Sequence, residues 1–182
     1  SALSMDAVLL SDGESSAFEE AVGYAWKHAG GGERRTSLPG RLSTTLELRG
    51  TRDVYPEMAA ADAEGLFRFL VARGIVRAVS EPLPAFAGPA APLDNIEMIR
   101  APEAGTVLFH RDIGDRVEAG ERLATIVTRP GFPEGAIEVR APQAGLIVTR
   151  VSSRFARRRG DLMKIACDLP SSASRKPGTL ED

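Results

Sequence analysis

The stretch IRAPEAGTVLFHRDIGDRVEAG at residues 99–120 aligns without gaps on VRAPQAGLIVTRVSSRFARRRG at residues 139–160. The offset is constant at 40 residues for the pairs Pro102/Pro142, Gly105/Gly145 and Gly120/Gly160. A repeat of this kind predicts two copies of one structural unit. In each copy, Ala-Pro suits the start of a strand, where the ladder needs no N–H donor, and Ala-Gly suits a tight bend. We therefore expect an all-β module over residues 96–167, in which two strand–turn–strand units bury one shared core.

The composition of the chain changes on both sides of this module. Residues 81–95, EPLPAFAGPAAPLDN, contain four prolines and predict a semi-rigid linker. Residues 168–182 contain few apolar side chains, which is typical of a disordered tail. Residues 1–80 mix helical and strand patterns, and these predict a separate α/β part.

Within residues 1–80 we expect a helix, a strand and a second helix. Ser16 and Glu19 form a capping box at the start of the first helix. Alternating apolar residues predict a strand over residues 42–48. Pro56 is suited to begin the second helix and Gly74 to end it. Because one strand cannot form a sheet by itself, we expect residues 1–80 to be the C-terminal part of a larger domain.

The overall composition excludes several classes of protein. The chain has 182 residues and a formal net charge of −2, so it has no excess of positive charge for binding a polyanion. A single cysteine, Cys167, excludes an intramolecular disulfide framework and favours the reducing cytoplasm. No apolar run approaches the ~18 residues of a membrane span. We expect a cytoplasmic protein that binds no membrane. Because the first methionine is Met5, we also expect the chain to be processed, tagged or cut from a longer one.

The segment TTLELRGTRDVY at residues 44–55 carries the candidate catalytic residue. Glu47 lies near the carboxyl end of the predicted strand, which is the edge where α/β sheets place their ligands. A partly desolvated carboxylate at that edge is suited to proton transfer. The alternative is that Glu47 and Arg49 are ordinary charged residues on a solvated edge strand. The residues alone leave both interpretations open.

The motif APxAG…GDxVxxGexL, followed by a second APxAG…GDxL, resembles the biotinyl/lipoyl-type barrel-sandwich hybrid over residues 96–167. Carrier domains of this fold present a modified lysine on the turn between the two repeats. The corresponding connection here, TIVTRPGFPEGAIE at residues 125–138, contains no lysine. The lysines of the chain are Lys27, Lys164 and Lys176. We therefore expect neither biotin nor lipoate on this module.

A wider pattern resembles the C-terminal half of the succinylglutamate desuccinylase/aspartoacylase family, over about residues 17–167. It consists of the TLELRG strand, a DV–Y turn, the helix ADAEGLFRFLVARGIV, a proline-rich link and the β module. The family consists of zinc hydrolases that cleave the amide of N-acyl amino acids. The resemblance implies an α+β fold: a C-terminal fragment of a carboxypeptidase-like α/β domain followed by an all-β barrel-sandwich hybrid module. It also implies that Glu47 is the general base and that Arg49 orients a substrate carboxylate.

The chain departs from this family in its metal ligands. The family binds zinc through a His-x-x-Glu pair and a later histidine, all in the N-terminal half. The two histidines here, His28 and His110, open no such motif. We expect His28 to be a surface residue at a helix C-terminus and His110 to be a strand residue. A catalytic zinc needs three protein ligands, so we expect none in this chain and no activity from the chain alone.

Two interpretations of the function follow. The first is a portion of a zinc-dependent amidohydrolase that removes an acyl group from an N-acyl amino acid, completed by the missing N-terminal half or by a homo-oligomer. The second is a non-catalytic lipoyl-like binding or adaptor module. A His-x-x-Glu motif in the sequence upstream would decide for the enzyme. Long coiled-coil helices flanking the module would favour an adaptor, and the sequence contains none.

A basic cluster marks the second repeat at Arg154, Arg157, Arg158 and Arg159. The corresponding part of the first repeat is acidic, with Asp112, Asp115 and Glu118. The simpler interpretation is a solvated turn. The more specific one is electrostatic docking against an acidic surface of a neighbouring subunit. Nucleic-acid binding is disfavoured because Phe155 is the one aromatic residue beside these arginines.

Overall fold

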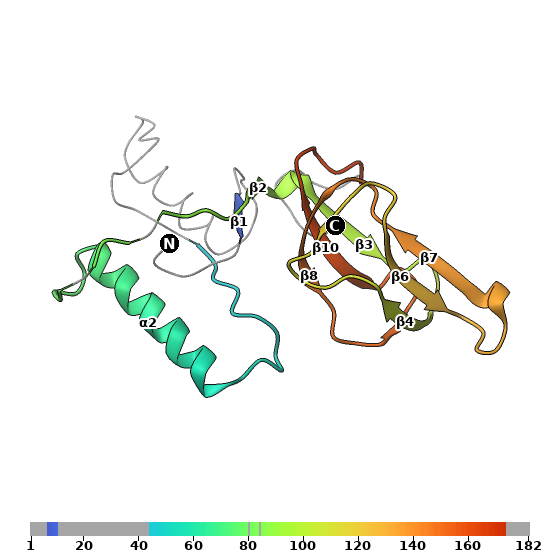
Figure 1. Cartoon of the computed structure of the whole chain (residues 1–182), viewed down its shortest axis with the longest axis horizontal. Coiled ribbons are helices and arrows are strands. Elements are labelled where there is room, and N and C mark those ends of the chain that lie inside the picture. Colours follow the sequence, from blue (N-terminus) through green and yellow to red (C-terminus); the bar gives the residue numbers. More distant parts are fainter. Residues whose placement is uncertain (1–6, 11–43, 80, 84, 174–182) are drawn as a thin grey trace, which may run out of the picture. The chain divides into compact units, whose positions relative to one another are not determined.

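The computed structural model describes residues 7–10, 44–79, 81–83 and 85–173. The chain divides into two compact units (Figure 1). Unit 1 consists of Ser1–Val8 and Glu14–Ala90, and unit 2 consists of Leu9–Gly13 and Ala91–Asp182. The predicted first helix and His28 lie outside the described residues. In the part of the chain that the structure describes, no helix is long and apolar enough to cross a membrane.

Unit 1 contains the predicted second helix, α2 (Pro56–Ala72). Proline occupies its first turn, and Gly74 follows its C-cap with φ +71°, the left-handed conformation that ends many helices. The predicted strand over residues 42–48 is wrong for its described part, because residues 44–48 form no strand. Alternating apolar residues do not by themselves make a strand, because a strand also needs a neighbouring strand that completes its hydrogen-bond ladder.

The linker prediction holds only in part. Residues 90–92 form the short strand β2 (Ala90–Pro92), which pairs with β1 (Val8–Leu10) in a two-stranded sheet. A 3-10 helix, η1 (Leu93–Asn95), leads into the β module. Six of the fifteen residues of the predicted linker, residues 90–95, are therefore regular structure, and the linker prediction is wrong for them.

Unit 2 contains two four-stranded sheets built from eight strands. The first sheet has the order β3-β10-β8-β5 and the second has the order β7-β6-β4-β9. All neighbouring strands that the structure records in these sheets are antiparallel. The strands are β3 (Ile96–Arg100), β4 (Gly105–Phe109), β5 (Arg116–Val117), β6 (Arg122–Val127), β7 (Ala136–Arg140), β8 (Gly145–Arg150), β9 (Phe155–Ala156) and β10 (Asp161–Cys167).

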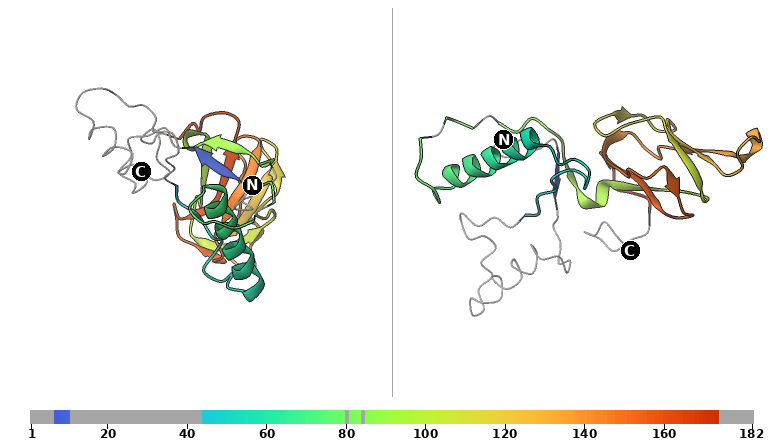
Figure 2. Two further views of the ribbon diagram at one scale, coloured as in Figure 1. Left: turned by 90° about the vertical axis from the view of Figure 1, so that its left-hand side faces the viewer. Right: turned by 90° about the horizontal axis from the view of Figure 1, so that it is seen from below.

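The two repeats exchange strands between the two sheets. The first repeat contributes β3 and β5 to the first sheet and β4 and β6 to the second. The second repeat contributes β8 and β10 to the first sheet and β7 and β9 to the second. Figure 2 shows this interleaving as green and yellow strands lying among orange and red ones. Neither repeat could form its half of the structure alone.

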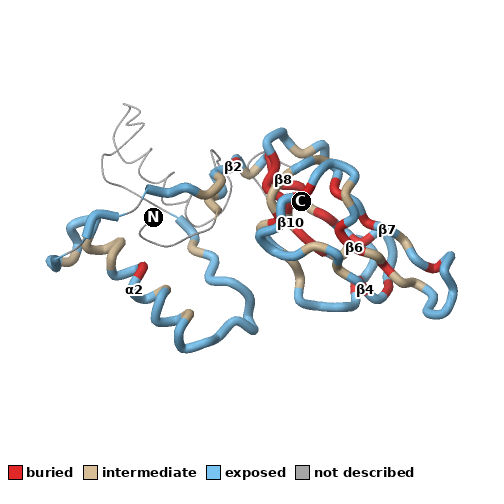
Figure 3. Tube along the Cα trace, in the orientation of Figure 1, coloured by how far each residue is buried: buried red, intermediate tan, exposed pale blue. Residues whose placement is uncertain are grey.

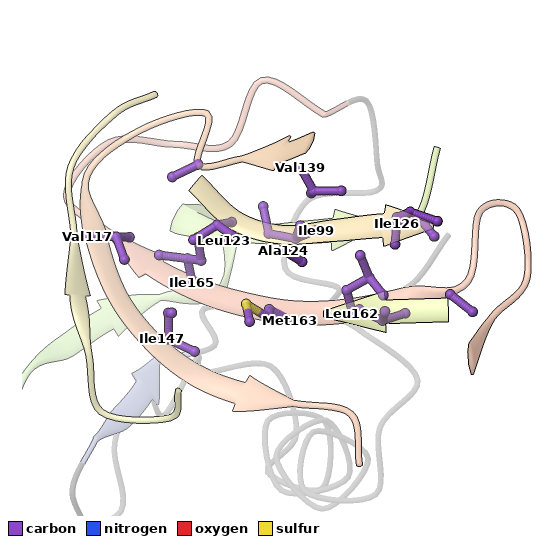
Figure 4. Packing of buried hydrophobic residues seen from close by; sticks show 14 of the residues in the cluster. Ile99, Val117, Leu123, Ala124, Ile126, Val139, Ile147, Leu162, Met163 and Ile165 are labelled. Carbon is purple, nitrogen blue, oxygen red and sulfur yellow. The ribbon is translucent and has the colours of Figure 1, made fainter. Parts of the chain in front are cut away.

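The core lies between these sheets (Figure 4). Its largest members are fully buried, and both repeats supply them in matching positions: Val107 and Ile147, Leu123 and Leu162, and Ile126 and Ile165. A smaller cluster of Ala91, Ile96 and Ala166 packs with Met98 and Val148. Burying each such aliphatic side chain contributes about 1.5–3 kcal/mol, so the core stabilises the module without any metal or disulfide.

The gapless alignment of the repeats is wrong beyond residue 150. The N–H of Gly120 donates to the carbonyl of Ala141, and the N–H of Arg159 donates to the carbonyl of Ala101, both at 2.8 Å. Arg159 therefore occupies the position of Gly120, an offset of 39, because the second hairpin is one residue shorter than the first. Both residues are left-handed, with φ +80° at Gly120 and +64° at Arg159. The gapless alignment pairs Gly160 with Gly120 instead, because both residues are glycine.

Replacing Arg159 with glycine should stabilise the protein by about 0.5–1 kcal/mol. The left-handed conformation destabilises a non-glycine residue by roughly 1–2 kcal/mol, and glycine removes this strain. Glycine also increases the conformational entropy of the unfolded chain, which offsets part of the gain in stability. Chemical denaturation of Arg159→Gly and of the wild type measures the difference. The reverse change at the equivalent position, Gly120→Arg, should destabilise the protein. If the wild type, Arg159→Gly and Gly120→Arg were equally stable, the structural equivalence of positions 120 and 159 would be contradicted.

Cys167 is buried at the end of β10, and its thiol has an unusual ionisation. Burial, together with the nearby Glu97 carboxylate, raises the pKa of the Cys167 thiol from 9.0 to about 11. We expect a thiol-specific reagent at about pH 8 to label the folded protein at least 100-fold more slowly than the urea-unfolded protein, because the thiolate is the reactive form. A spectrophotometric thiol assay with and without urea measures this ratio. Labelling at the same rate in both states would show that Cys167 is accessible in the fold.

The prediction of a disordered tail over residues 168–182 is wrong for residues 168–173. Asn95 donates its side-chain amide to the carbonyl of Asp168 at 2.8 Å. Ser171 donates its backbone N–H to the carbonyl of Asp94 and its hydroxyl to Glu97, each at 2.8 Å. Residues 168–173 are therefore fastened to the β module, and residues 174–182 lie outside the described part. Composition missed this because the bonds come from residues more than 70 positions away.

Candidate functional site

The two predicted site residues lie in the segment that precedes α2. Glu47 and Arg49 are both exposed, and among the described residues the Glu47 carboxylate has no hydrogen-bond or ion-pair partner. The partial desolvation expected for Glu47 is therefore not present in the described structure. An exposed and unpaired carboxylate is nevertheless free to approach another molecule.

A tight turn fixes the backbone just after these residues. The N–H of Asp53 donates to the carbonyl of Gly50 at 3.0 Å, and the N–H of Gly50 donates to the Asp53 carboxylate at 3.0 Å. Arg49 enters this turn in the left-handed conformation, with φ +64°. Such a conformation costs about 1–3 kcal/mol for a side chain other than glycine. The turn thus holds the Arg49 side chain in one direction at an energetic cost.

That direction is toward α2. Nη1 of Arg49 donates to Oδ2 of Asp62 at 2.6 Å, and the Asp62 side chain is only 16% exposed. Sequence reasoning missed Asp62 as part of the site, because it lies 13 residues away on a helix whose orientation the local pattern does not determine. Asp62 is thus a residue that only the structure links to Arg49.

The surroundings of this segment are open and apolar. In the described part of unit 1 only Gly65 is buried, as Figure 3 shows for α2. Leu48 is 46% exposed and Val54 81%, while Leu66 and Phe67 on α2 are 40% and 45% exposed. Large apolar side chains at this level of exposure in one short region are typical of a surface that contacts other polypeptide.

The described residues do not fit a zinc site. They contain no group of three or more His, Cys, Asp or Glu side chains that could hold a metal ion. Nε2 of His110 lies 2.8 Å from Oγ1 of Thr125 on the β module, but the prediction of a strand residue is wrong by one position, because β4 ends at Phe109. His28 lies outside the described residues. Arg49 is thus joined to α2 through Asp62, and the described residues place no set of metal ligands beside Glu47 or Arg49.

The connection at residues 125–138 holds no lysine at its tip. Arg129 lies over the ring of Phe132 at 4.4 Å from the centroid and 3.7 Å from the Glu134 carboxylate. Lys164 belongs to the middle of β10, away from any turn. Arg129 thus contacts both Phe132 and Glu134 within this connection.

Two comparisons with known proteins gave no result. No protein-family model matches this chain. No curated protein matches it either.

Solved structures do resemble the chain. A structure assigned to the succinylglutamate desuccinylase/aspartoacylase family from Shewanella frigidimarina matches 95% of this chain with a TM-score of 0.73 and 22% identity. A succinylglutamate desuccinylase from Silicibacter matches 90% with a TM-score of 0.61 and 17% identity. A family member from Shewanella amazonensis matches 63% with a TM-score of 0.56 and 24% identity.

The chain covers only part of each of these structures, namely 48%, 46% and 32% of their lengths in the same order. Sequence identities below 25% show that the fold is shared, but they do not show a shared activity. The structural neighbours of this chain are therefore succinylglutamate desuccinylase/aspartoacylase family proteins, and the chain has the fold of a part of them.

Proposed function

We propose that this chain is a portion of a zinc-dependent amidohydrolase that removes an acyl group from an N-acyl amino acid. The observation that carries the proposal is the similarity over 95% of the chain to a solved structure of the succinylglutamate desuccinylase/aspartoacylase family. The TLELRG segment supports it, because the glutamate at the position of the family's general base is exposed and forms no ion pair with the described residues.

In this proposal Glu47 accepts the proton of the water that attacks the amide carbonyl. A carboxylate without an ion-pair partner keeps its charge available for that transfer, and a positioned base contributes roughly 10²–10⁴-fold to such a step. Glu47 later returns the proton to the leaving amine. The product pair is then a free carboxylic acid and an amino acid.

Arg49 would bind the carboxylate of the amino-acid part of the substrate. Its guanidinium can engage a carboxylate through two parallel N–H donors. The ion pair with Asp62 holds the Arg49 guanidinium in place, so Asp62 acts as a positioning residue. The substrate carboxylate would then bind a guanidinium that is already oriented. This assignment fits the left-handed backbone at Arg49, which maintains the side-chain direction.

The zinc ligands of the proposed enzyme would come from polypeptide outside this sequence. The described residues do not fit the metal, and the chain has only two histidines. When bound, zinc would supply Lewis-acid activation of water or of the carbonyl. This chain by itself would then be inactive, and the β module would serve as an accessory part without biotin or lipoate.

The non-catalytic binding module remains the second function, and one observation favours it. Every buried hydrophobic residue of the described structure lies in unit 2, so the β module has a complete core of its own. A module of this kind can act as an adaptor without the residues before it.

Assays with N-acetyl and N-succinyl amino acids test the proposal. The isolated chain should release no amino acid and should contain no stoichiometric zinc by elemental analysis. The protein that also carries the metal ligands should hydrolyse at least one substrate of this class. Stoichiometric zinc in the isolated chain, or no hydrolysis by the metal-containing protein, would reject the proposal in favour of the binding module.

A further inference from the structure

The two hairpins that connect the sheets are equivalent in backbone and opposite in charge. We call residues 110–121 the acidic hairpin and residues 150–160 the arginine hairpin. The N–H of Val107 donates to the carbonyl of Arg154, and the N–H of Ile147 donates to the carbonyl of Asp115. This exchange makes Arg154 the counterpart of Asp115. With the same offset of 39, Arg157 is the counterpart of Glu118.

The arginine hairpin carries positive charge that the described residues do not neutralise. It contains five arginines and no acidic residue. Arg150 pairs with Asp112 at 3.0 Å, and Arg158 lies 3.5 Å from Glu103. Arg154 lies over the ring of Phe109, 5.2 Å from its centroid, and its charge also acts on the Asp112 carboxylate. Within the described ranges, the exposed residues Arg157 and Arg159 form no ion pair with a carboxylate. Phe155 lies among them and is 61% exposed.

Arg159 gives a second and independent reason to assign a role to this hairpin. Its left-handed backbone is strained, whereas the equivalent position in the acidic hairpin is a glycine. The Arg159 side chain makes no ion pair with the described residues that would offset this strain. Strain at an exposed charged residue is typical of a site where the side chain contacts another molecule.

The carboxylates of the acidic hairpin fall into two groups, those that form ion pairs within the chain and those that do not. A hydrogen bond from the N–H of Ile113, with the Arg150 charge, holds the pKa of Asp112 below its usual value. A hydrogen bond from the N–H of Glu118, with Arg111, does the same for the pKa of Glu121. Asp115 and Glu118 are exposed and make no ion pair with the described residues. Asp115 also accepts the N–H of Asp112 at 2.8 Å, but neither acid forms an ion pair with the described residues, and the two are the counterparts of Arg154 and Arg157.

We propose that the arginine hairpin binds the acidic hairpin of a second copy of this chain. The charges at the equivalent positions 115/154 and 118/157 are opposite, so the two hairpins complement each other. Exposed Arg116, the counterpart of Phe155, can stack on that ring in the facing copy. Every copy supplies both surfaces, so the partner is always present at equal concentration. This proposal does not depend on the proposed function, because it uses neither Glu47 nor a metal.

The test is sedimentation equilibrium of the full chain and two charge variants. The wild type should associate above its monomer mass of 19.4 kDa, and about 0.5 M salt should weaken the association. The first variant, Arg154→Glu with Arg157→Glu, and the second, Asp115→Asn with Glu118→Arg, should each self-associate at least about tenfold more weakly. Asparagine at position 115 keeps the acceptor for the N–H of Asp112, which the aspartate provides at 2.8 Å.

Mixing the two variants gives the decisive result. The first variant keeps a native acidic hairpin and the second keeps a native arginine hairpin, so together they should associate where neither does alone. A control with Arg77→Glu and Arg129→Glu changes the net charge equally outside the hairpins and should behave as the wild type. Circular dichroism checks that all variants fold.

Three results would overturn the proposal: a monomeric wild type at several hundred micromolar, association that the hairpin variants leave unchanged, or a mixture that stays monomeric. A monomeric wild type that binds a different acidic protein through these arginines also counts against it.

Discussion

Replacing Glu47 with glutamine should lower kcat for hydrolysis of an N-acyl amino acid by about 10²–10⁴-fold. The measurement requires the protein that also carries the metal ligands. Glutamine has nearly the same shape as glutamate but cannot accept the proton of the attacking water. If Glu47 acts only in the reaction, KM should change little while kcat falls.

Two controls separate catalysis from stability. Glu47 is exposed, so Glu47→Gln should leave the melting temperature nearly unchanged, as surface substitutions usually do within about 0.5 kcal/mol. The neighbouring change Thr45→Ser should preserve activity, because it alters the same segment without removing a carboxylate. Wild-type turnover in Glu47→Gln would remove Glu47 from the mechanism.

Replacing Gly145 with alanine should destabilise the β module by about 3 kcal/mol. A Cβ atom at Gly145 would overlap the carbonyl oxygen of Ala166 and lie 2.7 Å from Cγ2 of Ile165. Both atoms belong to β10, the central strand that pairs with β3 and β8, so the backbone cannot move away without breaking the ladder. Urea denaturation, followed by circular dichroism, measures the loss.

The duplication supplies a matched test and a control for this effect. At Gly105 the added Cβ would lie 2.5 Å from the carbonyl oxygen of Val127, so Gly105→Ala should cost a similar amount. At Gly114 nothing lies within 4 Å of the added atom, and the φ of +90° is the only obstacle. Gly114→Ala should therefore cost only about 1 kcal/mol. Equal losses at all three glycines would mean that backbone conformation, and not close approach, explains them.

The sequence determined the features that depend on local chemistry or on self-similarity. The repeat predicted an all-β module in which two units share one core, and the structure contains antiparallel strands from Ile96 to Cys167 around one core. Pro56 and Gly74 predicted both ends of α2, because proline fits a first turn and glycine fits a left-handed position. The missing lysine at residues 125–138 is likewise a fact of sequence alone.

Tertiary structure decided what depends on partners far away in the chain. Residues 44–48 alternate like a strand but form none, because a strand is stable only when another strand supplies its hydrogen bonds. The exchange of hydrogen bonds between Gly120, Ala141, Arg159 and Ala101 set the true offset of the repeats at 39, against the match of glycine with glycine. Asp62 became the partner of Arg49, and Glu97 the anchor of Ser171, through contacts across 13 and 74 positions. Local propensity does not encode such pairings, because they arise only when packing has fixed where each element lies.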